Sequence, residues 1–475
     1  PDCPDLSGNR VRLDDLDRLR QGIFERLKLW FVKFWKIFRG HPLIWDTVTT
    51  TGWSTIGKSI GFLIPFFIAA WFGVSSETDA FVFAYGLILF LSNIFAPVVE
   101  NVIVPFIAEA RKNGQDVGRF IGNVLGIGSI GLLVLEVAAL LVVKPVLSVV
   151  TDFDPRTLNL IYSLLLETSP LVLLLVWTSI LNGTLNAYKK FVFPAVSPAF
   201  RAIINIGIIF SLRDQMGVHA IALGYVVGEL SRLLILFGVI RWLRLFKLRI
   251  SFHLTARLRR FFRTASYQTV GMVAVWFKPI VDRAMASWLA VGSVSVLYYA
   301  DRLYIIPITF IATGLMATTL SHWSIRRYEM GSGRLGADVR RVVITVGLIT
   351  VFITVFLIVL RRPIVYLAYG RGAITPDLMN EVGRVWFFYL LGLPFYIVAR
   401  IYIQAHLVLK NTRFLMIYAF GLNGLGIIGN YILMNIMGVA GIALSTTSVT
   451  ALSVVFLSYM LTRKLKKERE VIMIT

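Results

Sequence analysis

The sequence has almost no cysteine and lacks the motifs of several enzyme classes. Cys3 is the single cysteine in 475 residues, which excludes an internal disulfide and a cysteine-based metal cluster. The five histidines show no HExxH or similar ligand spacing, and we find neither a Walker lysine loop nor a Ser/His/Asp arrangement. We therefore expect a protein that is not an enzyme.

Charge of either sign is scarce, whereas long apolar runs are frequent. Hydrophobic residues make up 57% of the chain, charged residues 16%, and the mean hydropathy is +0.75. A composition this apolar lies outside the range of ordinary soluble domains. We expect an all-α polytopic membrane protein.

Windows of about 20 apolar residues identify membrane helices. The sequence has about twelve of them, near 48–73, 79–109, 119–143, 157–185, 191–212, 218–241, 265–290, 294–321, 340–361, 384–408, 413–435 and 438–462. Such a chain predicts two six-helix lobes around a central cavity.

A net charge of +22 could indicate a protein that binds nucleic acid, but the positions of the charges in the sequence argue against this function. Most of the 48 Lys and Arg residues lie in alternate connections between the helices and at both ends of the chain. By the positive-inside rule, this alternation places both termini in the cytoplasm. We expect the lipid bilayer as surroundings and no nucleic-acid partner.

The same pattern predicts a division of the chain. We expect a cytoplasmic N-terminal segment (1–42), a first lobe (43–241), a basic cytoplasmic linker (242–264), a second lobe (265–462) and a basic cytoplasmic tail (463–475). Within the N-terminal segment, residues 13–39 mix Trp, Phe and Leu with Lys and Arg at helical spacing, which predicts an amphipathic helix in the membrane interface.

Short matches between the halves indicate an internal repeat. MGVHAIAL at 216–223 matches MGVAGIAL at 437–444, and AAWFGV at 69–74 matches ASWLAV at 286–291. Two parallel halves related by an axis along the membrane normal enclose a cavity between them.

Charged residues inside the predicted helices are the strongest indication of function. An ionised side chain at mid-membrane costs roughly 2.5 to 3.5 kcal/mol on insertion scales, so it usually faces a partner or a water-filled cavity. Asp301 and Arg302 lie in one such apolar run. The other basic residues are Lys58, Arg201, Arg232, Lys278, Arg283 and Arg400.

These cations divide into two groups. Arg232 and Glu229 are three residues apart and can pair on one helical face, while Arg201 and Arg400 can extend toward the membrane surface. Lys58, Lys278, Arg283 and Arg302 belong to helices that can line the cavity. Arginine suits phosphate because its planar fork donates two parallel hydrogen bonds. This second group predicts a site for an anionic head group.

Four segments resemble the MurJ (MviN) branch of the multidrug/oligosaccharidyl-lipid/polysaccharide (MOP) exporter superfamily. They are WFGVSSETDAFVFAY at 71–85, NAYKKFVFPAVSPAFRAIINI at 186–206, ASWLAVGSVSVLYYADRLYIIP at 286–307 and GVAGIAL at 438–444. The resemblance implies alternating access and flipping of a saccharide carried on undecaprenyl diphosphate in the bacterial inner (cytoplasmic) membrane. Lipid II is the substrate of this branch, and a related exopolysaccharide unit is an alternative.

The resemblance also implies roles for particular residues. Arg302 matches the important arginine of the eighth helix, Asp79 the aspartate of the TDAF motif, and Lys58 a first-helix arginine. Two other basic positions of the family fall on Ile64 and on Ser92 or its neighbour. We expect Arg302, Lys58, Arg283 and Lys278 to contact the diphosphate, with Asp79 and Asp301 in support.

A cation site between the seventh, eleventh and twelfth helices occurs in some members. Its counterparts here are Asp282, Asn423, Asn430 and Thr446, which offer oxygen ligands to Na+. No organic cofactor is expected, and coupling to Na+ or to protons stays open.

Two other functions stay open as well. A drug or cation antiporter of the same superfamily would need a site rich in acidic residues, and the basic cavity argues against it. A scaffold that binds lipid-linked sugars without moving them, alongside cell-envelope or polysaccharide synthesis proteins, is the other.

Overall fold

The computed structural model describes residues 42–330, 332–409 and 411–474, and every element in these ranges is a helix. The predicted interfacial helix at 13–39 lies outside them. The helices are α2 (Pro42–Phe72), α3 (Ser76–Lys112), α4 (Val117–Val150), α5 (Pro155–Thr168), α6 (Pro170–Ala187), α7 (Val192–Met216), α8 (His219–Trp242), α9 (Ala256–Ala286), α10 (Ser293–Met330), α11 (Ser332–Val359), α12 (Arg361–Tyr369), α13 (Pro376–Val408), α14 (Thr412–Met437) and α15 (Val439–Ile474).

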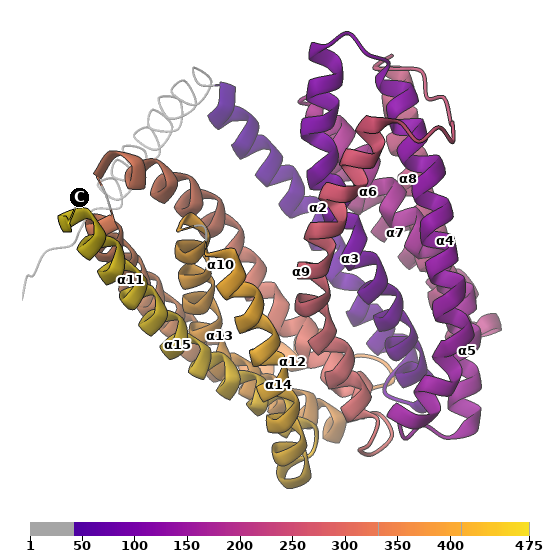
Figure 1. Ribbon diagram of the computed structural model, residues 1–475. Helices are drawn as coiled ribbons and strands as arrows, with labels where there is room; N and C mark the ends of the chain where they lie inside the picture. Colours follow the sequence, from indigo (N-terminus) through magenta and orange to yellow (C-terminus); the bar gives the residue numbers. More distant parts are fainter. Residues whose placement is uncertain (1–41, 331, 410, 475) are drawn as a thin grey trace, which may run out of the picture.

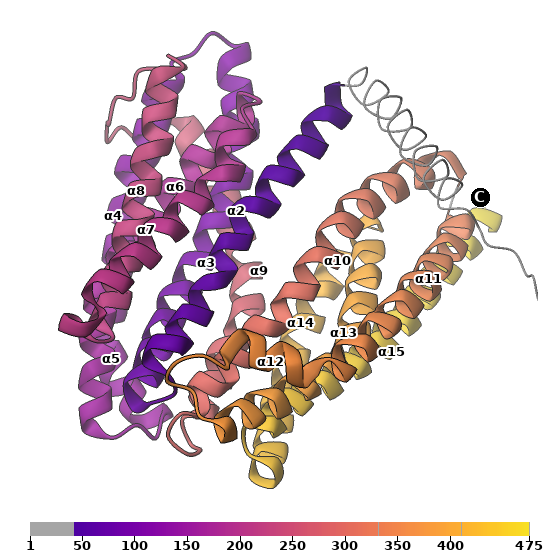
Figure 2. The ribbon, with the colours of Figure 1, turned by 180° about the vertical axis from the view of Figure 1, so that it is seen from behind.

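The helices form two bundles. α2 to α8 make the first bundle and α10 to α15 the second, while α9 packs along α3 and also contacts α14 (Figures 1 and 2). Both views show the bundles apart where α2 and α9 begin, and together where α10 and α13 begin. We call these the open end and the closed end. The prediction of an all-α, two-lobed membrane protein is confirmed.

Eleven spans in the described part of the chain are long and apolar enough to cross a membrane. α5 and α6 count as one of these spans, and Pro170 at the first position of α6 explains the break between them. α9 also has 31 residues, but its sequence is much less apolar. The polarity of α9 comes partly from Lys278, Asp282 and Arg283.

The outward faces of the bundles suit a lipid environment. Large apolar side chains are exposed along α4 and α11, among them Leu141, Val149, Leu348 and Phe352. In water such contiguous apolar surface would drive association, whereas in a bilayer it contacts the acyl chains.

The internal repeat has a structural counterpart. Gly217 ends α7 with φ 55° and ψ −135°, and Gly438 ends α14 with φ 63° and ψ −140°. Each glycine N–H donates to the carbonyl four residues back, at 2.9 Å from Arg213 and 2.8 Å from Met434. Positive φ favours glycine because it has no Cβ. The two halves therefore use the same turn before their last long helix.

Candidate functional site between the two bundles

Arg302 lies in the third turn of α10, near the closed end. Its guanidinium is half-buried and lies 4.7 Å from the centroid of the Tyr298 ring. The Nε atom is buried without a hydrogen-bond partner, and Arg302 makes no salt bridge to any residue that the structure describes. A cation–π contact leaves the N–H groups of the fork able to bind another group.

Arg283, on α9, packs against the backbone of α3 at Gly86. A Cβ atom at Gly86 would overlap the Nη1 atom of Arg283, so glycine at this position makes room for the guanidinium. Arg283 lies within electrostatic range of Asp301 and Arg302, and it too lacks a salt bridge within the described ranges. α9 and α10 thus bring two arginines to one region.

The first bundle contributes its own basic cluster, from α7 and α8. Glu229 is buried and accepts from Arg201 Nη1 at 3.2 Å and from Arg232 Nη1 at 3.3 Å, while Arg232 Nε donates to Ser197 Oγ at 2.9 Å. The predicted Glu229–Arg232 pair is confirmed. The expectation that Arg201 extends toward the membrane surface is wrong, because the buried Glu229 holds it.

Three tyrosines connect the arginines of the two bundles. Tyr85 on α3 and Tyr225 on α8 have ring centroids 4.3 Å apart, and both lie within electrostatic range of Arg201, Arg302 and Tyr298. None of the three hydroxyls is hydrogen-bonded to another described residue. Only the arginines were noticeable in the sequence, because tyrosines are common in membrane helices.

The charges in this region do not cancel. In the first bundle Arg201 and Arg232 face Glu229, and Glu100 also lies within electrostatic range of Arg232, whereas Arg283 and Arg302 face Asp301. A positive surplus therefore remains around Arg283 and Arg302, where the donors are guanidinium and phenol groups. The chemistry of such donors suits a phosphate-containing anion better than a cation.

Lys278 is bound to a separate group of polar side chains, on α9, α14 and α15. Its Nζ atom lies 2.9 and 2.7 Å from the two carboxylate oxygens of Asp282 and 2.9 Å from Thr446 Oγ1, and Asn430 donates to Asp282 at 2.6 Å. Asn423 is not part of this group, because its amide donates to the carbonyl of Ala274. The structure therefore brings three of the four predicted Na+ ligands together, around a lysine that we predicted to contact the diphosphate.

Asp79 holds the closed end together. Its carboxylate accepts from the backbone N–H groups of Gly292 and Ser295, at 2.7 Å each, and from the Ser295 hydroxyl. An acidic side chain of α3 thus caps the N-terminus of α10 in the other bundle, where the helix dipole favours negative charge.

Two further contacts join the bundles at this end. The Tyr299 hydroxyl donates to the Gly73 carbonyl at 2.8 Å, and the Ala373 N–H donates to the Ala70 carbonyl at 2.9 Å. The closed end is therefore fastened at several points by hydrogen bonds between the lobes.

The resemblance to the MurJ branch also singles out Lys58, Ile64 and Ser92 in the first bundle. The side chain of Lys58 lies outside the described part of the structure. Ile64 is buried in the apolar core, and buried Ser92 donates to the Ile88 carbonyl at 2.8 Å. The described cations of the first bundle that lie near the tyrosines are therefore Arg201 on α7 and Arg232 on α8, and not residues at positions 64 and 92.

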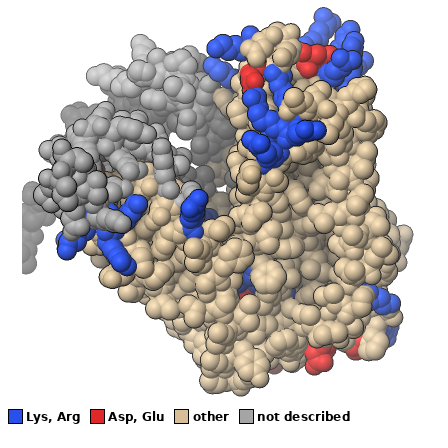
Figure 3. All heavy atoms as spheres, viewed as in Figure 1, with Lys and Arg blue, Asp and Glu red and all other residues tan. Residues whose placement is uncertain are grey.

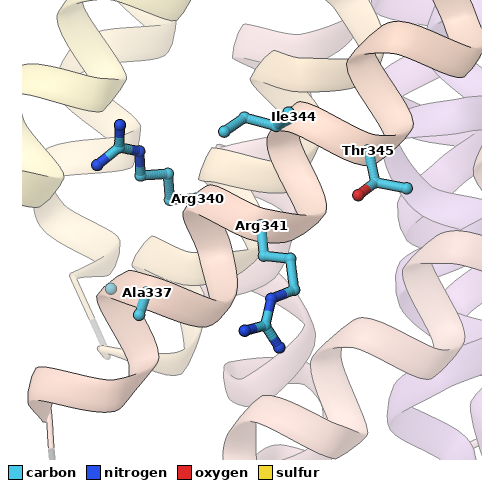
Figure 4. Close-up of a pocket in the computed structure, with 6 residues that line it drawn as sticks. Ala337, Arg340, Arg341, Ile344 and Thr345 are labelled. Carbon is cyan, nitrogen blue, oxygen red and sulfur yellow. The ribbon is translucent and has the colours of Figure 1, made fainter.

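A pocket at the start of α11 lies apart from this region (Figure 4). Its lining includes Arg340, Arg341, Ile344 and Thr345, all from one helix, and both arginines are exposed. α11 begins at the open end, away from the first turns of α10. We therefore place the candidate site at the arginines and tyrosines between the bundles.

Comparison with known proteins agrees with this fold. The family model described as lipid II flippase MurJ matches residues 68–475. A probable lipid II flippase MurJ from Thermotoga maritima is 26% identical over 403 residues, covering 84% of this chain and 81% of its own. The lipid II flippase MurJ from Thermosipho africanus is 27% identical over 406 residues, covering 85% and 82%.

Solved structures show the same architecture. A lipid II flippase MurJ in an inward closed conformation superposes with a TM-score of 0.74 at 25% identity, covering 88% of this chain and 87% of its own. An inward-facing multidrug resistance transporter of the MATE family also reaches 0.74, at 12% identity with 89% and 99% covered, which shows the shared fold alone. This chain, a multi-pass membrane transporter, belongs to the MurJ family of lipid II flippases.

Proposed function

We propose that this protein moves an undecaprenyl-diphosphate-linked saccharide across the bacterial cytoplasmic membrane by alternating access. The observation that carries the proposal is the pair of arginine groups, one from each bundle, that meet around Tyr85, Tyr225 and Tyr298. A diphosphate diester bears a negative charge on each phosphate, which suits the two arginines, Arg283 and Arg302, that lack salt bridges to described residues. The relatives are named for lipid II, and we propose lipid II as substrate, with a related exopolysaccharide unit as the second candidate.

Arg302 and Arg283 are the proposed diphosphate contacts. They lack salt bridges to described residues and lie between the bundles, whereas Lys278 is held by Asp282. Glu229 compensates part of the charge of Arg201 and Arg232, which fixes the orientation of these two side chains. The apolar outer faces would let the prenyl tail stay in lipid while the head group crosses.

We also propose that the open end faces the cytoplasm. Lys and Arg side chains gather at this end of the first bundle, over the ends of α3, α4, α8 and α9 (Figure 3). α2 begins at the open end and α15 runs back to it from the closed end, so both termini would be cytoplasmic. Opening to the other side would require the hydrogen bonds of Asp79 and Tyr299 to break.

The proposal is tested with the full chain reconstituted in vesicles, by following translocation of the head group of fluorescent lipid II. Arg302→Ala should reduce the rate at least tenfold, because a hydrogen bond to a charged group contributes about 1.5–3 kcal/mol. Arg400→Ala is the control, since Arg400 on α13 also lies over a tyrosine, Tyr396, but is exposed.

Equal rates for wild type and Arg302→Ala would remove Arg302 from the mechanism. Binding of the lipid without translocation by the wild type would favour the scaffold function. Translocation of an exopolysaccharide lipid but not of lipid II would change the assigned saccharide and leave the diphosphate contacts in place.

A further inference from the structure

The ammonium group of Lys278 occupies the centre of the oxygen cluster between α9, α14 and α15. An ammonium group has three N–H donors. Here they face three oxygens, the two of the Asp282 carboxylate and the hydroxyl of Thr446, all within 2.7 to 2.9 Å. The donors of Lys278 are therefore satisfied within the protein.

The surrounding residues are arranged to hold this ammonium. Asn430 is fully buried and donates to Asp282 Oδ1, and Thr446 donates its own proton to the Ile442 carbonyl at 3.1 Å, which leaves its lone pairs for Lys278. The Oδ1 atom of Asn430 is buried without a partner. A Cβ at Gly426 would come within 2.9 Å of Lys278 Cε, so the glycine makes room for the lysine stem.

The oxygens around Lys278 are the kind that a small monovalent cation uses. They consist of one carboxylate and one hydroxyl, with the unpaired Asn430 amide oxygen nearby, and no thiol or imidazole belongs to the group. Within the described residues no cluster of three or more His, Cys, Asp or Glu could hold a metal ion either. The donor set thus suits a singly charged hard cation, and it already holds one.

A second cation would not fit beside the lysine. The single carboxylate of Asp282 is neutralised by Lys278, and the two side chains are only 13% and 19% exposed. Arg283 is the next residue in the chain and lies within electrostatic range of Asp282. Adding Na+ would leave an uncompensated positive charge in a poorly hydrated place, which costs several kcal/mol.

We propose that Lys278 is a tethered cation that takes the place of a dissociable metal ion in this site. The wild-type protein then needs no Na+ to hold α9 against α14 and α15, and the site gains affinity for Na+ only when the ammonium is removed. This proposal concerns ion dependence and its test uses no lipid substrate, so it can fail independently of the proposed function.

The test is the melting temperature of the purified full chain in detergent, titrated with NaCl against choline chloride at constant ionic strength. The wild type should show no Na+-specific shift. Lys278→Ala, and in parallel Lys278→Ser, should melt lower in choline and recover a saturable rise of a few degrees in Na+, as expected for a ligand that binds only the folded state. The double variant Lys278→Ala/Asp282→Asn should lose this rise.

Lys144→Ala is the control, because Lys144 is an exposed lysine near the end of α4 that lies over the Tyr162 ring and makes no salt bridge to a described residue. It should stay insensitive to Na+. If a Lys278 variant could be purified as folded protein only in a buffer that contains Na+, this result would also support the proposal. A saturable Na+ shift in the wild type, or two Lys278 variants that respond to Na+ neither in yield nor in melting temperature, would overturn it.

Discussion

At the scale of residues, the cations within the membrane helices differ in whether they form a salt bridge. Arg201, Arg232 and Lys278 each pair with a carboxylate, whereas Arg302 rests on the Tyr298 ring and Arg283 on the backbone of α3. A paired cation holds helices together, and breaking a buried pair by removing one partner costs about 3 to 5 kcal/mol. An unpaired cation can exchange partners during transport.

Gly86→Ala should reduce transport without unfolding the protein. Its Cβ would overlap the Arg283 guanidinium and force this side chain out of place, while alanine itself favours a helix by roughly 0.5–1 kcal/mol over glycine. In Gly86→Ala the rate of head-group translocation should fall several-fold. The melting temperature should stay the same or rise. Gly131→Ala, where a Cβ meets open space, is the control, and wild-type transport in Gly86→Ala would contradict the placement of Arg283.

The contacts that could be predicted from the sequence are those between near neighbours on a helix. Glu229 and Arg232 are three residues apart, and Lys278 and Asp282 four, so each pair shares a helical face. The third partners are Arg201, 28 residues from Glu229, and Thr446, 168 residues from Lys278. No local pattern indicates these contacts, because they depend on which helices pack together.

At the scale of elements, apolar periodicity predicted the long helices well and the short ones poorly. α12 was expected to be part of a loop at 361–384, since nine residues with two arginines carry too little apolar sequence to indicate a membrane helix. α9 was predicted to begin at 265 but begins at Ala256, after the N-cap Thr255, whose hydroxyl accepts from the Leu258 N–H at 3.2 Å. Capping residues are frequent outside helices too, so they mark such starts only weakly.

The start of α5 depends on Asp154, which lies between the membrane spans. Its carboxylate accepts from the N–H groups of Arg156 at 3.0 Å and Thr157 at 3.1 Å and from the Thr157 hydroxyl. These hydrogen bonds, the one from the Thr157 hydroxyl first, hold the pKa of Asp154 below its usual value. The folded state is therefore favoured at pH values above about 4, and this contribution is lost as the pH falls through the lowered pKa.

We expect Asp154→Ala to speed hydrogen exchange at the amides of Arg156 and Thr157 at pH 7, because the N-cap acceptor is gone. In the wild type the protection of these amides, corrected for intrinsic exchange, should fall on acidification below about pH 4, whereas the variant should lack this component. Mass spectrometry of the 150–165 region measures both effects. Equal protection in the two proteins at pH 7 would show that the cap is not needed.

At the scale of the whole molecule, the contacts at the closed end determine which side is open. Asp79 caps α10 across the bundle interface, and Tyr299 and Ala373 bond to the end of α2 and the residue that follows it. The partners of Asp79 are more than 200 residues away in sequence, which is why the TDAF motif pointed to importance without indicating a role. The two-bundle shape follows from the internal repeat, whereas the open and closed ends could not be predicted.

Asp79→Ala should shift the protein toward a form in which the closed end separates. Each amide bonded to the carboxylate contributes about 1.5–3 kcal/mol, so the balance between the two forms should move by at least tenfold. Spin labels on Glu77 and Arg371, in a chain with Cys3→Ser, would report a larger fraction of long distances. Asp377→Ala is the control. Asp377 is an exposed acid in the first turn of α13, at the closed end, and its removal should leave the distances between the labels unchanged. An unaltered distribution in Asp79→Ala would mean that other contacts suffice to close this end.

The matching turns at Gly217 and Gly438 allow the two halves to be compared position by position. At the offset of 221 residues that relates these glycines, Arg201, Glu229 and Arg232 correspond to Leu422, Thr450 and Ser453. Ser453 still donates to the Thr450 carbonyl at 2.7 Å, so a local hydrogen bond persists where the charges are absent. The two copies of the repeat have thus diverged at these positions: the first holds a buried cluster of charged side chains, and the second keeps uncharged residues that hydrogen-bond locally.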